Sequence, residues 1–255
     1  MMFPLERQEK LLQYINKKKK ANVQELSRMF KVSAVTIRRD LDELASKGLV
    51  VKTHGGVLSA MNNLSMEIPS AVKFEANSEA KRSIGAAAAA MIDDGDIIIL
   101  DAGSTTLEVL RHMQRQNVTV LTNDIKIAME TAHKPNVRLL VSGGEMLDGS
   151  VYTLVGSQTA QFFRRVHVNK TFLGCDAIDI GFGVSNRTME EVEVKRAMIA
   201  AADEVIMVTD SSKLNKKVFC FLCEVSAIQK LVINEIDDVF RQELEKRGVE
   251  VIVSG

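Results

Sequence analysis

The segment KVSAVTIRRDLDELASKG, residues 31–48, predicts one helix with a clear beginning and end. Ser33 is a suitable N-cap, because its hydroxyl can accept a hydrogen bond from a free backbone N–H of the first turn. Lys47 and Gly48 mark the end, since a cation suits the negative end of a helix and glycine adopts the left-handed conformation that commonly follows it. The apolar residues at helical spacing, which predict one buried stripe, are Ile37, Leu41 and Leu44.

The face opposite this stripe carries Thr36, Arg38 and Arg39 in the first two turns. Short polar groups and guanidinium groups near a helix N-terminus are typical of a helix that reads the major groove of DNA. The alternative for the helix taken alone is an amphipathic helix whose arginines are only solvated. The flanking segments decide between the two.

Two shorter helices are expected before this segment. Apolar residues between positions 5 and 15 predict the first, which leads into the lysine run 17–20, a solvated helix end or a set of phosphate contacts. Asn22 followed by Glu25 predicts the cap of the second. Its buried face is expected to consist of Val23, Leu26, Met29 and Phe30. A few residues separate it from the third helix, which is the helix-turn-helix arrangement.

Residues 49–58 contain two short β-prone runs around Gly55-Gly56, which predicts a small hairpin, or wing, with Lys52 and His54 near its tip. Residues 1–58 are therefore expected to form a winged helix-turn-helix domain. His54 can equally well be interpreted as a phosphate contact or as an ordinary turn residue. For the domain as a whole, a three-helix bundle without a role in DNA binding remains an alternative.

The charge distribution favours the DNA-binding interpretation. Residues 1–60 contain twelve Lys and Arg against six Asp and Glu, a net charge of +6. The whole chain of 255 residues has 33 of each kind, so residues 61–255 carry −6. A basic N-terminal part on an acidic body indicates that nucleic acid binds at one end only.

The string Val32-Ser-x-x-Thr-Ile-Arg-Arg-Asp-Leu41, with Gly48 and His54-Gly-Gly56 behind it, resembles the DeoR family of bacterial transcription regulators. The resemblance implies that residues 33–39 open the recognition helix. The residues expected to contact DNA are Ser33, Ala34, Val35, Thr36, Arg38, Arg39, Lys52 and His54.

Residues 59–77 contain turn formers and a proline without a sustained period, and we interpret them as a linker. From residue 78 to 255, helical and apolar strand patterns alternate, with strands expected at 97–100, 118–121, 137–141, 171–173, 205–208, 231–233 and 249–253. Alternating strands and helices predict a Rossmann-like parallel sheet, and hence an α/β fold for this domain.

Ligands of such sheets bind beyond the carboxyl ends of the strands. Asp101 follows the first strand and precedes Gly103, where the backbone can approach a ligand closely. Ser104, Thr105 and Thr106 add hydroxyl groups at a helix N-terminus, which favours a phosphate. The alternative is a capped helix with nothing bound. Asp101 is expected either to hold sugar hydroxyls or to cap the loop that follows it.

Polar residues also follow other predicted strands. The candidates for the same ligand site are Asn123, Gly143, Gly144, Asp176, Lys195 and Lys213. The two lysines are the candidate cations for a phosphate. For Lys195 a surface pair with Glu191, four residues before it on a helix, is an equally good interpretation.

These strand-end strings resemble the sensor domain of the DeoR family in order and spacing, so the resemblance covers nearly the whole chain. It implies that the body binds a phosphorylated sugar or a related metabolite that changes the affinity for an operator. It also implies a fold shared with ribose-phosphate isomerases, sugar-phosphate deaminases and CoA-transferases, and self-association as a homodimer or homotetramer.

An enzyme is the main alternative. Gly174-Cys-Asp-Ala-Ile-Asp179 is similar to the acidic motif of ribose-phosphate isomerases, but the glycine loop that follows, residues 180–183, lacks that family's lysine. A proton-shuttling isomerase needs both a base and an electrophile, so we expect binding and no catalysis. A constitutive DNA-binding protein whose body only oligomerises is the other alternative.

Composition sets the remaining expectations. No apolar run approaches the ~20 residues that cross a bilayer, and no secretion signal is apparent at the N-terminus, so a cytoplasmic protein without membrane contact is expected. Cys220 and Cys223 lie among apolar neighbours, which favours core cysteines over a redox pair or zinc site. Neither a cofactor nor a metal is expected. The sequence thus predicts a repressor of a carbohydrate-use operon.

Overall fold

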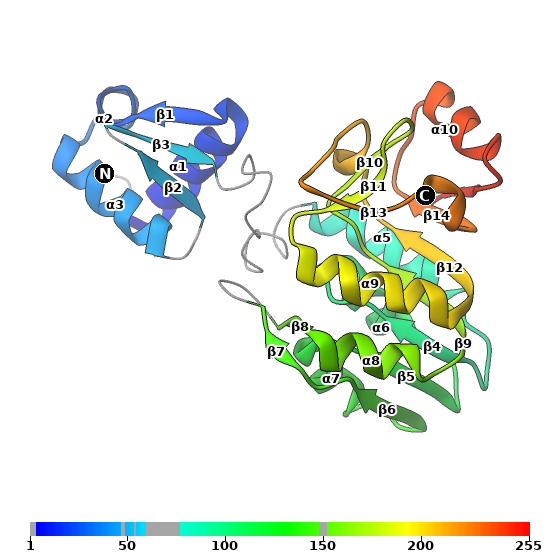
Figure 1. The fold of residues 1–255 in the computed structure, drawn as a ribbon. Coiled ribbons are helices and arrows are strands. Elements are labelled where there is room, and N and C mark those ends of the chain that lie inside the picture. The colour runs from blue at the N-terminus through cyan, green and yellow to red at the C-terminus, as the bar shows by residue number, and fades with distance from the viewer. Residues whose placement is uncertain (1–3, 47–48, 54, 60–76, 148–151) are drawn as a thin grey trace. The chain divides into compact units, whose positions relative to one another are not determined.

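The computed structural model describes residues 4–46, 49–53, 55–59, 77–147 and 152–255. The chain divides into two compact units, Met1–Val72 and Lys73–Gly255, each described here by itself (Figure 1). Among the helices within the described ranges, none combines the length and apolar character that a membrane span requires.

The first unit packs three helices against a small antiparallel sheet. The helices are α1 (Pro4–Lys18), α2 (Val23–Phe30) and α3 (Ala34–Ser46). The strands are β1 (Lys20–Asn22), β2 (Val50–Thr53) and β3 (Gly56–Ser59), in the order β1-β3-β2. The core combines the apolar stripes of all three helices, with Leu11, Ile15, Leu26, Ile37, Leu41 and Leu44 all buried.

Both predicted helix caps are confirmed. The Asn22 side chain accepts a hydrogen bond from the Glu25 N–H at 2.7 Å, and the Ser33 hydroxyl accepts one from the Thr36 N–H at 3.1 Å. Lys31 ends α2 in the left-handed conformation, which sets the sharp turn between the two helices. The predicted end of α3 at Lys47 and Gly48 lies outside the described residues.

One expectation for this unit was wrong. Met29 does not belong to the buried face of α2, because it is 47% exposed. The lysine run contains the solvated end of α1 at Lys18, and Lys20 begins β1, a strand that was not predicted. Lys19 makes this change of direction with a positive φ of 67°. Cross-strand hydrogen bonding with β3, which is distant in sequence, decides the conformation here.

The wing is present, with a turn shifted by one residue from the predicted one. Thr53 pairs with Gly56, so Gly56 belongs to a strand and not to the turn. Gly56 lies inside β3, where a Cβ would come within 2.7 Å of the Ala21 carbonyl oxygen. A glycine is needed there because β1 approaches too closely for any side chain.

The second unit is a seven-stranded parallel sheet, as the alternating pattern predicts. Its strand order is β15-β14-β12-β9-β4-β5-β6. The strands are β4 (Ile97–Leu100), β5 (Val118–Thr122), β6 (Val137–Val141), β9 (Val168–Leu173), β12 (Ala202–Val208), β14 (Lys230–Ile233) and β15 (Glu250–Val253). All seven predicted strands are confirmed.

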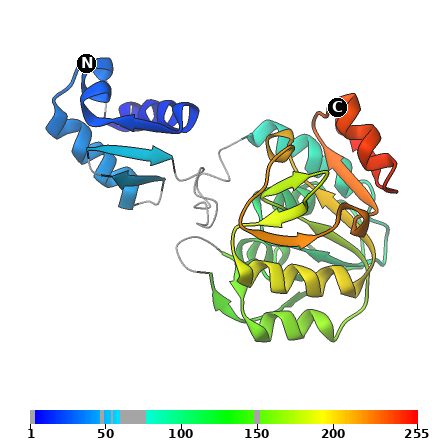
Figure 2. The same cartoon turned by 45° about the horizontal axis from the view of Figure 1, so that its top comes forward.

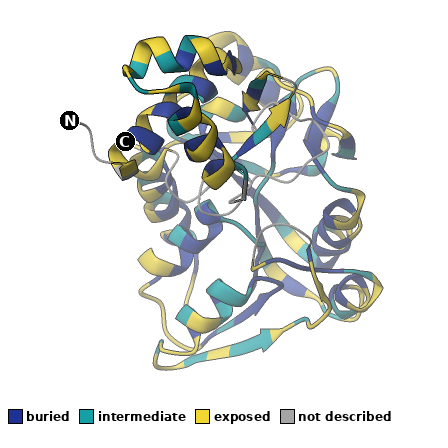
Figure 3. Cartoon of the chain, turned by 90° about the vertical axis from the view of Figure 1, so that its left-hand side faces the viewer, coloured by how far each residue is buried: buried dark blue, intermediate teal, exposed yellow. Residues whose placement is uncertain are grey.

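Helices cover both faces of this sheet (Figures 1 and 2). One core contains α5 (Ser78–Ala89), α6 (Ser104–His112) and α7 (Ile125–Thr131), packed on Ile98 and Leu100. The other contains α8 (Ser157–Arg164), α9 (Met189–Ala201) and α10 (Asp238–Glu245), packed on Ile99. Successive residues of β4 thus pack against helices on opposite faces of the sheet. The exposed residues of the helices lie on their outer sides (Figure 3).

Short strands that the sequence analysis did not predict complete the unit. A hairpin forms from β7 (Glu145–Met146) and β8 (Leu154–Val155). A three-stranded antiparallel sheet forms from β10 (Ala177–Asp179), β11 (Gly183–Asn186) and β13 (Cys220–Cys223). The β10–β11 hairpin is inserted between β9 and α9, and it carries polar residues to the carboxyl edge of the main sheet.

Candidate functional site

The outer face of α3 carries the residues expected to contact DNA. Arg38 and Arg39 are exposed, and Val35 is 72% exposed. Arg39 Nε lies 3.6 Å from a Glu43 carboxylate oxygen, one turn further along the same helix. Arg38 instead lines an open hollow together with Gln24 and Arg28 of α2. The two neighbouring arginines therefore lie in different surroundings.

The first-turn hydroxyl groups are engaged within the helix itself. The Ser33 and Thr36 hydroxyl oxygens lie 2.9 Å apart, and the Ser33 oxygen also accepts from the Thr36 N–H. Both hydroxyls therefore take part in the cap. Ala34 is half-buried against the core of the unit.

A buried ion pair fixes α3 on α1. The Arg7 guanidinium donates to both carboxylate oxygens of Asp40, with Nε 2.5 Å from Oδ2 and an amino nitrogen 3.0 Å from Oδ1. This hydrogen bonding raises the pKa of Arg7 above its usual value. Gln8 donates to Glu43 at 2.6 Å beside the pair. The bidentate geometry holds the recognition helix at one orientation.

Of the two wing residues predicted to contact DNA, the structure describes Lys52. Lys52 is exposed and forms an ion pair with Asp42 of α3. His54 lies outside the described residues. The interaction with Asp42 links the wing to the recognition helix, and Lys52 keeps about half of its side-chain surface exposed.

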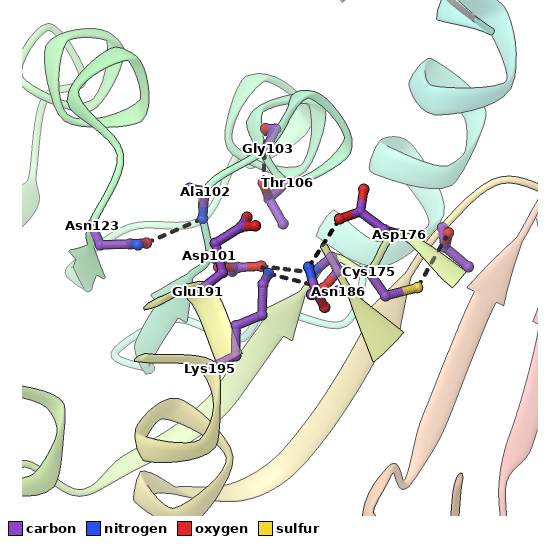
Figure 4. Close-up of polar contacts among 12 residues, drawn as sticks. Asp101, Ala102, Gly103, Thr106, Asn123, Cys175, Asp176, Asn186, Glu191 and Lys195 are labelled. Carbon is purple, nitrogen blue, oxygen red and sulfur yellow. Dashed lines mark hydrogen bonds and ion pairs between the residues drawn. The ribbon is translucent and has the colours of Figure 1, made fainter. Parts of the chain in front are cut away.

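In the second unit, Asp101 forms the centre of a buried polar cluster at the carboxyl edge of the sheet (Figure 4). Asp101 follows β4 and is 1% exposed. Its carboxylate accepts from the Gly174 N–H at 2.9 Å, which joins the end of β4 to the end of β9. It also accepts from the ammonium group of Lys195 on α9, which donates in addition to the Gly174 carbonyl at 3.0 Å.

The interpretation of Lys195 as half of a surface pair was wrong. Lys195 is 3% exposed and Glu191 is 7% exposed, and the ion-pair partner of Lys195 is Asp101, 94 residues earlier. Burial alone would lower the pKa of Lys195, but the carboxylates of Asp101 and Glu191 outweigh it and hold the pKa above its usual value. The ammonium group therefore stays charged although it is buried.

The loop from Asp101 into α6 has the predicted glycine and hydroxyl groups. Gly103 is the N-cap of α6 with a φ of 155°, and it has no side chain to accept from the first-turn N–H groups. Thr106 is buried and donates to the Gly103 carbonyl at 2.8 Å, whereas Thr105 is half-buried. Ser104 is 9% exposed. The positive helix end thus lies beside the cluster, and its N-cap residue contributes no side-chain cap.

Asn123 and Asp124 support this loop from the end of β5. Asn123 accepts from the Ala102 N–H at 3.2 Å and donates to the Leu154 carbonyl at 2.9 Å. Asp124 caps α7 by accepting from two of its N–H groups, and the Gly103 N–H also donates to it. Burial raises the pKa of Asp124 to about 6, because these hydrogen bonds only partly offset the cost of desolvation.

The β10–β11 hairpin brings further buried polar groups to Asp176. The Asn186 side chain and the Arg187 N–H donate to its carboxylate at 3.4 and 3.2 Å. Asn186 and Arg187 were not predicted as site residues, and Glu191 was expected only as a possible surface partner of Lys195. The Thr188 hydroxyl donates to Glu191 at 2.8 Å. The capping-box pattern at Thr188 and Glu191 indicates a helix start. No local sequence feature indicates that this helix start lies beside Asp176.

Gly143 and Gly144 have other neighbours than the polar cluster, and Lys213 lies near Cys175. Gly143 and Gly144 lie in the turn before β7, where the Thr159 hydroxyl donates to the Gly143 carbonyl. A Cβ on Gly144 would come within 2.0 Å of the Thr159 hydroxyl oxygen, so close packing explains that glycine. Lys213 ends a 3-10 turn, Ser211–Lys213, after β12, and it lowers the pKa of the Cys175 thiol without offsetting burial.

The cysteines pack as expected. Cys220 is buried in the core, and Cys223 packs against this core. Burial raises the pKa of the Cys223 thiol to about 11. Cys175 lies beside the polar cluster, where burial raises the pKa of its thiol to about 12 (Figure 4). Neutral thiols of this kind are poor nucleophiles and poor metal ligands at neutral pH.

Two family models together match most of the chain. Residues 7–63 match the DeoR-like helix-turn-helix domain, and residues 76–235 match the DeoR C terminal sensor domain.

Named relatives match over almost the full length. The "Putative aga operon transcriptional repressor" of Escherichia coli O157:H7 is 35% identical over 98% of this chain and 94% of its own. The HTH-type transcriptional repressor GlcR of Bacillus subtilis (strain 168) is 30% identical over 99% and 97%. The transcriptional repressor AccR of Agrobacterium fabrum is 30% identical over 96% of each chain.

Solved structures match only in part. The delta subunit of eIF2B from Chaetomium thermophilum shares 18% identity, with a TM-score of 0.45 over 63% of this chain and 57% of that one. Ribose 5-phosphate isomerase from Plasmodium falciparum shares 17% identity, with a TM-score of 0.38 over 52% of each chain.

Proposed function

Because the chain belongs to the DeoR family of transcription regulators, and is a DNA-binding regulator and not an enzyme, we propose that a phosphorylated sugar controls it. In this proposal residues 1–58 bind the operator, and residues 78–255 bind the sugar phosphate and self-associate. Residues 59–77 link these two domains. The regulated genes are those of a carbohydrate-use operon, which the protein represses.

The N-terminus of α6, which has a glycine as its N-cap, supports a phosphate site. The first N–H groups of a helix and its dipole favour an anion, and the N-cap here is Gly103, which lacks a side chain. Thr105 is half-buried in the first turn, and we propose its hydroxyl as a further donor. The glycine N-cap is the single observation on which the site assignment depends most.

The buried cluster beside that helix end supports recognition of the sugar. Carboxylates accept hydrogen bonds from hydroxyl groups, and Asp101 and Asp176 lie at the ends of β4 and β9, neighbouring strands of the sheet. Lys195 has three N–H donors, of which Asp101 and the Gly174 carbonyl take two. A polyhydroxylated ligand matches this mixture of acceptors and donors better than an apolar one does.

Binding at this cluster can alter the structure around it. Asp101 and Lys195 connect β4, β9 and α9, so a ligand that competes for either group shifts those elements relative to each other. A coupling free energy of about 1–3 kcal/mol changes DNA affinity ~5- to 150-fold, which is sufficient for a genetic switch. We propose that a homodimer or homotetramer places two DNA-binding units on one operator.

The test is a DNA-binding titration with the full-length chain. A fluorescent duplex from upstream of the protein's own operon is titrated with protein, alone and with each member of a panel of sugar phosphates. The expected result is that one sugar phosphate changes the apparent Kd at least fivefold, while the same sugar without phosphate does not. Tight DNA binding that responds to nothing on the panel would contradict sugar-phosphate control and leave DNA binding intact.

Thr105→Ala is the variant for the phosphate site. It should bind DNA like the wild type but need a ~10-fold higher concentration of the active sugar phosphate, because one hydrogen bond to a charged group is lost. Thr119→Ala is the matched control. Thr119 is also half-buried, but it lies near the N-terminal end of β5, away from the carboxyl edge of the sheet. Equal ligand responses of the two variants would contradict the assignment of Thr105.

A further inference from the structure

Val35 is an apolar side chain on the face of α3 expected to contact DNA. It is the second residue of α3 and is 72% exposed, so it adds almost nothing to the core of its unit. Valine is also a weaker helix former than alanine. Neither packing nor helix propensity therefore explains an exposed valine at this position.

Three neighbouring polar side chains take part in interactions within the unit, whereas Arg38 lines the open hollow. Ser33 and Thr36 use their hydroxyls in the helix cap, as described above. Arg39, one turn after Val35 on the same face, lies beside Glu43. In the first turn of the recognition helix, Val35 is the large apolar side chain that is exposed, at 72%.

A second valine shows that the exposure alone does not define a site. Val239 is the second residue of α10 and is 73% exposed, so its helix position and exposure match those of Val35. Its neighbours before it are Asp237, which caps the helix, and Asp238. Those carboxylates repel a polyanion, whereas Val35 is followed by Arg38 and Arg39 on a basic unit.

We propose that Val35 recognises a thymine in the operator through the methyl group of that base. The inference rests on DNA binding by α3. Among unmodified bases, only thymine presents a methyl group in the major groove, and apolar side chains contact it there. Valine is suited to this contact because its χ1 angle is restricted in a helix, so little side-chain entropy is lost on binding. Ser33 and Thr36 then shape the helix tip through the cap.

The experiment removes the methyl group from the DNA and its partner from the protein. A duplex is selected from a random library by the wild-type chain, and each thymine of one half-site is replaced in turn by uracil, which lacks only the methyl. Dissociation constants are measured by fluorescence anisotropy for the wild type, Val35→Ala and Val239→Ala. Alanine is the better helix former, so Val35→Ala is expected to fold, and circular dichroism verifies this.

The expected result is one thymine position at which uracil weakens wild-type binding about fourfold, the equivalent of ~0.8 kcal/mol for one buried methyl group. Val35→Ala should bind the thymine duplex more weakly and show a uracil-to-thymine ratio of about one at that position. Val239→Ala should behave as the wild type at every position.

Four results would overturn the proposal. Val35→Ala could retain wild-type affinity for the selected duplex, or it could retain the wild-type ratio at every thymine. It could also lose DNA affinity together with a change in sedimentation, which would assign Val35 to contact with a second copy of the chain. A selected half-site without any uracil-sensitive thymine contradicts the proposal equally.

Discussion

Both units are held together by a buried ion pair between residues far apart in sequence, but they present their functional side chains in opposite ways. Arg7–Asp40 fixes the recognition helix, and Lys195–Asp101 fixes the carboxyl edge of the sheet. Around the first pair, the residues proposed to bind DNA are exposed. Around the second, the residues proposed to bind the sugar are buried.

The difference follows from the size and charge of the two ligands. A DNA duplex is too large to enter a protein, so its contacts must lie on the surface, where they are weak individually and sensitive to salt. A sugar phosphate can be enclosed, and polar groups waiting for it must satisfy each other inside the protein. Substitutions in the first unit should therefore change binding, and those in the second should change stability as well.

The largest effect is expected from Lys195→Met. It leaves the Asp101 carboxylate buried without its cation, and breaking such a pair costs about 3–5 kcal/mol of unfolding free energy. Urea denaturation followed by circular dichroism measures the loss. The double variant Lys195→Met with Asp101→Leu should recover most of it, because no buried charge remains unpaired. A single variant as stable as the wild type would show that the pair is not structural.

A smaller, pH-dependent effect is expected from Asp124→Asn. The folded-state pKa of Asp124, about 6, lies above that of the unfolded chain, so the folded state binds the extra proton between about pH 4 and pH 6. This group therefore lowers stability as pH rises through that window, by at most ~3 kcal/mol. Asparagine can still cap α7 but does not ionise.

Stability curves at a series of pH values between 4 and 7 test this prediction. The difference in unfolding free energy between Asp124→Asn and the wild type should grow with pH and level off above pH 6. A difference that stays constant over the whole range would mean that Asp124 does not titrate in this window.

Arg38→Ala should lower DNA affinity and leave stability nearly unchanged, unlike the substitutions in the second unit. Because Arg38 is exposed, the unfolding free energy should change by less than ~0.5 kcal/mol, while operator affinity falls by about 1–3 kcal/mol if Arg38 makes a base contact. Thermal unfolding and anisotropy on the same preparation measure both quantities. Lost stability together with unchanged affinity would place Arg38 outside the DNA interface.

The smallest effect is expected from Lys52→Ala. The Lys52–Asp42 ion pair is about half exposed at both side chains, and such pairs contribute at most ~1 kcal/mol to stability. If Lys52 also contacts a phosphate, the slope of log Kd against log salt concentration should fall by about one. An unchanged slope would limit Lys52 to holding the wing on α3.

Local patterns determined most of the elements. The Ser33 and Asn22 caps, the apolar stripe of α3 and the seven parallel strands all depend on residues within a few positions of each other, and the sequence shows such spacing directly. The loop from Asp101 to Thr106 was predictable for the same reason, since its glycine and hydroxyls follow an apolar strand. The DeoR-type motifs also lie in these local stretches.

Only the tertiary structure decided which polar groups meet. Lys195 pairs with Asp101 across 94 residues, and Glu191, its neighbour on α9, turned out to be buried as well. Asn186 and Arg187 reach Asp176 on a hairpin whose short strands have no clear periodicity, and Lys20 became part of a strand through its pairing with β3. Sequence spacing constrains the neighbours of a residue within a helix or strand. The partners across elements are set by the packing of the whole unit, where a buried charge must find its opposite.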